Sequence, residues 1–165
     1  MAVLGVAVWW YARPAPAQRL YEEGRAHQAA GRIGEAIVSY EQSLARAPER
    51  VEIRAYLGQC LLADKRVAAA IPHLNAAVTA GVRLDVTPFD LARALASTGD
   101  RDAARRALAR LTIPPQADTA SFVTAGRMAA ELGDPPLAIA FFRKVADRPD
   151  LPPDIAKVLA GLPGR

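Results

Sequence analysis

The amino-acid sequence predicts an all-α protein built from a repeated pair of helices. Similar residues recur at a step of 34 positions along most of the chain. About half of the residues (52%) are apolar but only 6% are aromatic, so alanine carries much of the apolar content. Alanine is the strongest helix former. A sandwich or barrel would need more β-branched and aromatic residues. The clearest of the repeated columns is alanine at positions 36, 70, 104 and 138.

The period divides most of the chain into four consecutive repeats, 17–50, 51–84, 85–118 and 119–152. Each repeat reads as helix, tight turn, helix. Small residues on the first helix face the alanine column of the second, which lets the two helices approach closely. Large residues fill the space beside them. The small residues are Gly24, Gly58, Ala92 and Gly126, and the large residues are Tyr40, Leu74, Leu108 and Phe142.

Turn and capping residues mark where the helices begin and end. Gly31, Gly99 and Gly133 stand at the turn inside three repeats, with Lys65 as the exception. Glycine can close a helix there by adopting a left-handed conformation. Asp100 is expected to cap the second helix of the third repeat, because aspartate accepts hydrogen bonds from free helical N–H groups. Asp134 is expected to do so in the fourth, followed by proline at the first helical position.

The two ends of the chain lie outside the repeats. Residues 153–165 predict a short closing helix and tail, which would cover the apolar flank of the last repeat. Residues 13–16 read as a linker. Residues 1–12 are uncharged and mostly apolar, but twelve helical residues cover only about 18 Å of the roughly 30 Å bilayer core. We interpret them as part of a membrane anchor, with aromatic residues and Arg13 at its end. The alternative is an apolar leader that packs on the first helix.

The repeated columns resemble the tetratricopeptide repeat (TPR) family, whose pattern is W-x2-L-G-x2-Y, then A-x3-F, then P. The resemblance covers about residues 17–152. Three residues depart from the pattern: Glu23, Arg54 and Pro88. Membership implies a right-handed α-solenoid of four helix-turn-helix units whose first helices line a concave groove. The first repeat carries the pattern in Leu20, Gly24, Ala36, Tyr40 and Pro48.

The resemblance also implies which residues would bind a partner. By position, one column of the groove holds three arginines, and a neighbouring column holds two aromatic residues. Arginine binds carboxylates with two N–H donors, and aromatic residues provide apolar anchoring. This favours an extended peptide or acidic segment as ligand, although the arginines could equally be a solvated surface. The expected groove residues are Tyr21, Arg25, Gln28, Tyr56, Gln59, Phe89, Arg93, Val123 and Arg127.

Nothing in the sequence predicts catalysis, a metal or a cofactor. One cysteine and two histidines show no spacing that would bring three or four zinc ligands together. No phosphate-binding glycine loop or nucleophile motif occurs, so we expect neither catalytic residues nor cofactors. The net charge of +4 is spread rather than gathered in a dense stripe, so nucleic-acid binding is not expected.

Together these features predict a non-enzymatic scaffold or adaptor that binds a protein or peptide in a membrane-associated complex. Arginine-rich, lysine-poor usage suggests a bacterial source and hence the inner membrane, with the side unassigned. A cytoplasmic location is the alternative. The chain could also be a regulatory or docking subunit of a neighbouring enzyme.

Overall fold

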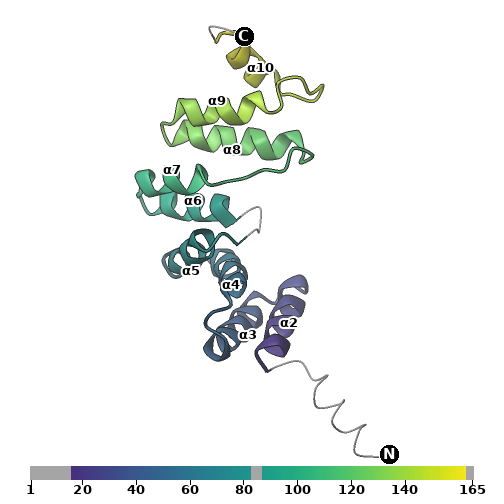
Figure 1. Cartoon of the computed structure of the whole chain (residues 1–165), viewed down its shortest axis with the longest axis vertical. Helices are drawn as coiled ribbons and strands as arrows, with labels where there is room; N and C mark the ends of the chain where they lie inside the picture. The colour runs from purple at the N-terminus through teal and green to yellow at the C-terminus, as the bar shows by residue number, and fades with distance from the viewer. Residues whose placement is uncertain (1–15, 83–86, 163–165) are drawn as a thin grey trace, which may run out of the picture. The chain divides into compact units, whose positions relative to one another are not determined.

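The computed structural model describes residues 16–82 and 87–162, and every regular element among them is a helix (Figure 1). The all-α class is therefore confirmed. The chain divides into two compact units, unit 1 up to Val82 and unit 2 from Arg83. Unit 1 contains α2 (Pro16–Ala29), α3 (Ile33–Arg46), α4 (Val51–Ala63) and α5 (Val67–Thr79). Unit 2 contains α6 (Thr87–Ser97), α7 (Arg101–Leu108), α8 (Thr119–Glu131), α9 (Pro135–Arg143) and α10 (Pro153–Ala160).

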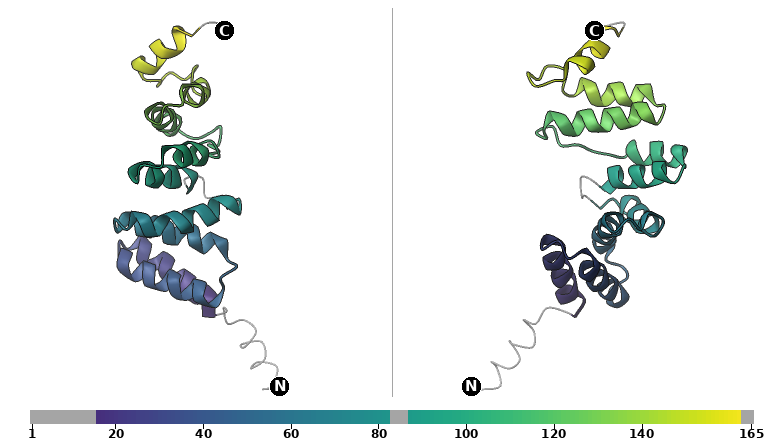
Figure 2. Two further views of the ribbon diagram at one scale, coloured as in Figure 1. Left: turned by 90° about the vertical axis from the view of Figure 1, so that its left-hand side faces the viewer. Right: turned by 180° about the vertical axis from the view of Figure 1, so that it is seen from behind.

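Each predicted repeat forms a pair of packed helices. In unit 1, α2 packs on α3 and α4 on α5, and α3 also contacts α4. In unit 2, α6 packs on α7 and α8 on α9, and α10 lies against α9. Two further views of the ribbon show the partners of a pair running side by side (Figure 2). The helix-turn-helix pairs predicted from the 34-residue period are thus present.

The repeated columns meet inside each pair. The alanine column is buried, with exposed fractions of 0% for Ala36, Ala70 and Ala104. A methyl group added at Gly24 would lie 2.6 Å from Cε1 of Tyr40. One added at Gly58 would lie 2.6 Å from Cγ of Leu74. Real Cβ atoms do not approach that closely, so the small column sets the spacing between the helices.

The turn and capping residues act as predicted, with one addition. Gly31, Gly99 and Gly133 have positive φ, and Lys65 adopts the same left-handed conformation at φ 62°. Asp100 accepts a hydrogen bond from the backbone N–H of Ala103 at 3.0 Å, and Asp134 one from Leu137 at 3.0 Å. Asp118 caps α8 in the same way, which sequence analysis did not identify.

The chain ends are only partly described. The closing helix is present as α10, anchored by Ile155, which is 4% exposed, whereas Val158 on the same helix is 47% exposed. The expected membrane segment, residues 1–12, lies outside the described residues. Within the described ranges, no helix has both the length and the hydropathy needed to cross a bilayer.

Candidate functional site

Three tyrosines from three helices gather in unit 1. Tyr21 of α2, Tyr40 of α3 and Tyr56 of α4 have ring centroids 5.7–6.2 Å apart. Aromatic rings at such distances attract one another beyond their burial. Tyr40 is fully buried, while Tyr21 and Tyr56 are half-buried and keep part of each ring at the surface. The cluster therefore combines a rigid base with an accessible aromatic surface.

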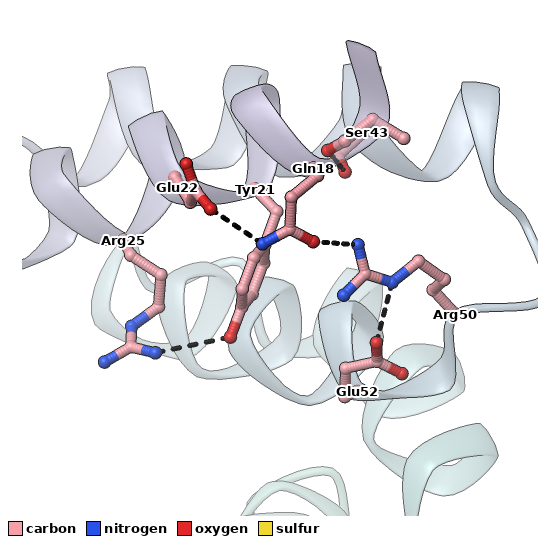
Figure 3. A network of polar contacts seen from close by, with 8 residues as sticks. Gln18, Tyr21, Glu22, Arg25, Ser43, Arg50 and Glu52 are labelled. Carbon is pink, nitrogen blue, oxygen red and sulfur yellow. Dashed lines mark hydrogen bonds and ion pairs between the residues drawn. The ribbon is translucent and has the colours of Figure 1, made fainter. Parts of the chain in front are cut away.

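Arg25 lies beside this aromatic surface, one helical turn after Tyr21. Its Nη1 donates a hydrogen bond to the Tyr21 hydroxyl at 3.3 Å (Figure 3). Its guanidinium lies 5.0 Å from the centre of the Tyr56 ring. The Tyr21 hydrogen bond is the main cause that raises the pKa of Arg25. The arginine is exposed and charged, with most of its N–H donors directed to solvent. We call Tyr21, Arg25 and Tyr56 the tyrosine–arginine platform.

A second arginine nearby has its donors occupied within the protein. Arg50 Nε donates to Glu52 at 2.8 Å, and its Nη1 donates to the side-chain oxygen of Gln18 at 2.6 Å. Gln18 in turn donates to Glu22 at 2.8 Å, which completes the network in Figure 3. Burial acts to raise the pKa of Glu52, but its backbone and Arg50 hydrogen bonds outweigh burial and lower it. Arg50 thus braces the platform, whereas Arg25 remains available.

Gln28 of α2 and Gln59 of α4 are the other two residues expected in this unit. Gln28 accepts a hydrogen bond from the buried Tyr40 hydroxyl at 2.8 Å, which fixes both side chains. Burial raises the pKa of Tyr40 well above its ordinary range, so the hydroxyl stays protonated as a donor. Gln59 is half-buried on α4, one turn after Ala55. Five of the nine expected groove residues therefore lie in unit 1, on α2 and α4.

The four expected residues of unit 2 have different surroundings. Arg93 pairs with Asp90 at 3.2 Å, and Arg127 pairs with Asp154 of α10 at 2.9 Å. Val123 is only 5% exposed. Its side chain is therefore buried on α8, and its place in a binding groove stays a prediction.

Phe89, the last of the nine, borders a cavity of about 540 Å³ in unit 2. We call it the loop cavity, because one wall is the connection between α7 and α8. Arg148 holds this connection by donating hydrogen bonds to the backbone carbonyls of Ala117 (2.5 Å) and Pro115 (2.6 Å). Its guanidinium also lies 5.4 Å from the centre of the Phe122 ring. The apolar lining includes Phe89, Leu111, Ile113, Pro114, Ala117 and Ala120.

The described residues contain no group of three or more potential ligands that could hold a metal ion. Cys60 is buried, and burial raises the pKa of its thiol to about 11, so it is not a nucleophile at neutral pH. His27 instead lies 2.8 Å from Glu35 in a surface contact. The arrangement suits binding through charge and aromatic contact.

Comparisons with known proteins agree with this geometry. The family model described as "Tetratricopeptide repeat" matches residues 21–81 and 89–152, which is more than half of the chain. No match is found among curated proteins. Among solved structures, "Crystal structure of MamA protein" is 21% identical with a TM-score of 0.65, covering 81% of this chain and 74% of that one. "MamA 41-end from Desulfovibrio magneticus RS-1" is 22% identical with a TM-score of 0.64, covering 78% and 73%.

A third similar structure is "Crystal structure of YrrB: a TPR protein with an unusual peptide-binding site". It is 24% identical with a TM-score of 0.64, covering 88% of this chain and 75% of that one. At these sequence identities the structural similarity establishes the fold alone. The ligand of this chain therefore has to be argued from its own residues.

Proposed function

Since the chain belongs to the tetratricopeptide repeat family, we propose that it is a non-enzymatic scaffold or adaptor that binds a partner protein through an extended, acidic peptide segment. The platform in unit 1 is the proposed contact. The fold is one used for protein interaction, and the similar structure YrrB is reported with a peptide-binding site.

The observation that carries this proposal is the exposure of Arg25 and the small number of contacts that its guanidinium makes within the protein. Its one hydrogen bond within the described part of the chain is the contact of 3.3 Å with Tyr21. Guanidinium donors match the two oxygens of a carboxylate, and such charge-assisted bonds are about twice as strong as neutral ones. The adjacent ring of Tyr56 offers apolar area for the same ligand. An aspartate or glutamate flanked by an apolar residue therefore fits this surface.

Preorganisation supports the same conclusion. The three tyrosines contact one another, Tyr40 is fixed by Gln28, and Arg50 is held between Gln18 and Glu52. A ligand that docks here meets side chains that are already ordered. Less entropy is then lost on binding, which raises affinity at a given contact area.

The proposed location is a bacterial membrane, on the strength of residues 1–12. This stretch is uncharged, and Trp9, Trp10 and Tyr11 precede Arg13 as at the end of a membrane helix. In this proposal the N-terminal segment holds the repeats near a membrane complex, where they recruit the partner.

The test is selection of a random peptide library displayed on phage with the full wild-type chain. Recovered peptides are then measured against Arg25→Gln and against Arg19→Gln. Arg19 is also an exposed arginine of α2, so the second variant is matched in charge and helix. We expect enrichment of acidic residues, and a loss of about 1 kcal/mol or more, roughly fivefold in affinity, for Arg25→Gln alone. Peptides without acidic enrichment, or equal losses in both variants, would contradict the proposal.

A further inference from the structure

Unit 2 carries a cavity whose chemistry differs from that of the platform. The loop cavity, about 540 Å³, is within the size range of pockets that enclose small ligands or side chains. Its walls come from the start of α6, the first turns of α8 and the connection between α7 and α8. These walls are mainly apolar, so the cavity suits an aliphatic or aromatic group.

The cavity lining also contains polar groups. The lining includes Gln116, Asp118, Ser121 and Thr124. Among the lining residues that the structure describes, Asp118 is the one ionisable side chain, and it gives this part of the cavity a negative charge. The Asp118 carboxylate already accepts a hydrogen bond from the backbone N–H of Ser121 at 2.8 Å. Two carboxylate oxygens offer about four acceptor positions, so others remain for a ligand.

Arg148, a cation that influences Asp118, has its terminal nitrogens occupied elsewhere. Its two terminal nitrogens donate to the carbonyls of Ala117 and Pro115, and its guanidinium lies over the Phe122 ring. Arg148 therefore closes the loop wall and lowers the pKa of Asp118 at a distance, secondary to the Ser121 hydrogen bonds. Asp118 can therefore still accept a hydrogen bond from a basic group of a ligand.

From this geometry we propose that the loop cavity is a second binding site, which takes a peptide segment where an apolar side chain is next to lysine or arginine. The apolar side chain enters between Phe89 and Ile113, and the basic group meets Asp118 at the edge. Hydroxyl and amide groups of Ser121, Thr124 and Gln116 face the ligand backbone. The residues of this second site all belong to unit 2, whereas the Arg25 site belongs to unit 1. An experiment can therefore refute either proposal without refuting the other.

The test is an NMR titration of the full, ¹⁵N-labelled chain with three capped tetrapeptides: Lys-Phe-Leu-Lys, Glu-Phe-Leu-Glu and Lys-Ser-Gly-Lys. We expect Lys-Phe-Leu-Lys to shift the amide signals of residues 111–124. We expect it to bind about two- to fivefold more tightly than the glutamate peptide, the range for one exposed charge pair. Lys-Ser-Gly-Lys, which has no apolar side chain, is expected to leave these signals unchanged.

Three variants separate charge from shape. Asp118→Asn removes the charge but keeps a good helix cap, so the preference for the lysine peptide should fall to about onefold. Glu131→Gln makes the same charge change at the other end of α8, about 20 Å away, and should leave the preference intact. Ala120→Trp fills the cavity from an exposed position and should abolish binding of both apolar peptides while the helical signal is retained.

Other outcomes would overturn the proposal. Equal binding of the glutamate peptide, survival of the lysine preference in Asp118→Asn, or shifts confined to unit 1 would each do so. If neutral N-phenyl-1-naphthylamine fills the cavity and no peptide competes, the site takes a small molecule instead. If dilution of the unliganded chain moves the same signals, the occupant is a second copy of this chain.

Discussion

Replacing Gly24 by alanine tests the first helix pair and the platform together. A Cβ at this position would lie 2.6 Å from Cε1 and 2.7 Å from Cδ1 of Tyr40. Carbon atoms in contact prefer about 3.5–4.0 Å, so the ring or the helix has to move by about 1 Å. Tyr40 is fully buried and hydrogen-bonded to Gln28, so neither movement is free.

The expected magnitude follows from two opposing effects. Overpacking a core costs about 1–3 kcal/mol. Alanine is better than glycine inside a helix by about 1 kcal/mol, which offsets part of that cost. The net expectation is a loss of about 1 kcal/mol in the free energy of unfolding, and at most about 2 kcal/mol. Because the Tyr40 ring contacts Tyr21 and Tyr56, the variant should also weaken peptide binding that depends on Arg25.

The assay is urea denaturation followed by circular dichroism, with two controls. Gly34→Ala on α3 meets no atom within 4 Å, so it should stabilise the same unit by about 0.5 kcal/mol. In a Tyr40→Ala background the ring is gone, and Gly24→Ala should become neutral or stabilising. A cost for Gly24→Ala that is the same in both backgrounds would refute the packing argument.

Three further predictions concern single residues. Lys65 has a left-handed backbone at φ 62°, so Lys65→Gly should stabilise the chain by about 1 kcal/mol in urea denaturation; destabilisation would contradict this. The buried Cys60 thiol, whose pKa is raised to about 11, should resist Ellman's reagent at pH 8 until guanidinium unfolds the chain. His73 has a lowered pKa, mainly because it is buried and secondly because Arg54 is near. Its neutral form is favoured in the fold, so stability should be full above about pH 6.5 and fall as the pH drops below that value. In His73→Gln this component of the pH dependence should vanish, and an unchanged profile would exclude the assignment.

The sequence was sufficient to predict the helix pairs because the period reports a packing requirement. A residue without a side chain on the first helix leaves room for a large side chain of the second, and the need returns as Gly24 against Tyr40 and Gly58 against Leu74. The left-handed turn is also local, so glycine signals it at most turns. Lys65 takes the same conformation without that signal, which shows that the hairpin geometry overrides the local preference.

The surfaces were less predictable, since side-chain partners do not follow the period. The same column gives Arg25 beside Tyr56, Arg93 beside Asp90 and Arg127 beside Asp154. These partners depend on residues that differ between repeats, so position within the repeat does not identify which arginine is available. Val123 is buried, so position within the repeat does not by itself report how exposed a side chain is.

The repeat pattern could not predict the loop cavity, and the reason is physical. Its wall is the connection that contains Pro114 and Pro115, and Arg148 holds this connection from a later part of the chain. A repeated backbone gives each unit the same helix pairs, so selectivity has to come from the positions where the repeats differ. In unit 1 those differences leave an exposed arginine beside aromatic rings, and in unit 2 they leave a carboxylate among the lining residues of an apolar cavity. One peptide composition therefore does not suit both proposed sites, and a partner of both would need an acidic stretch and, separately, a basic apolar one.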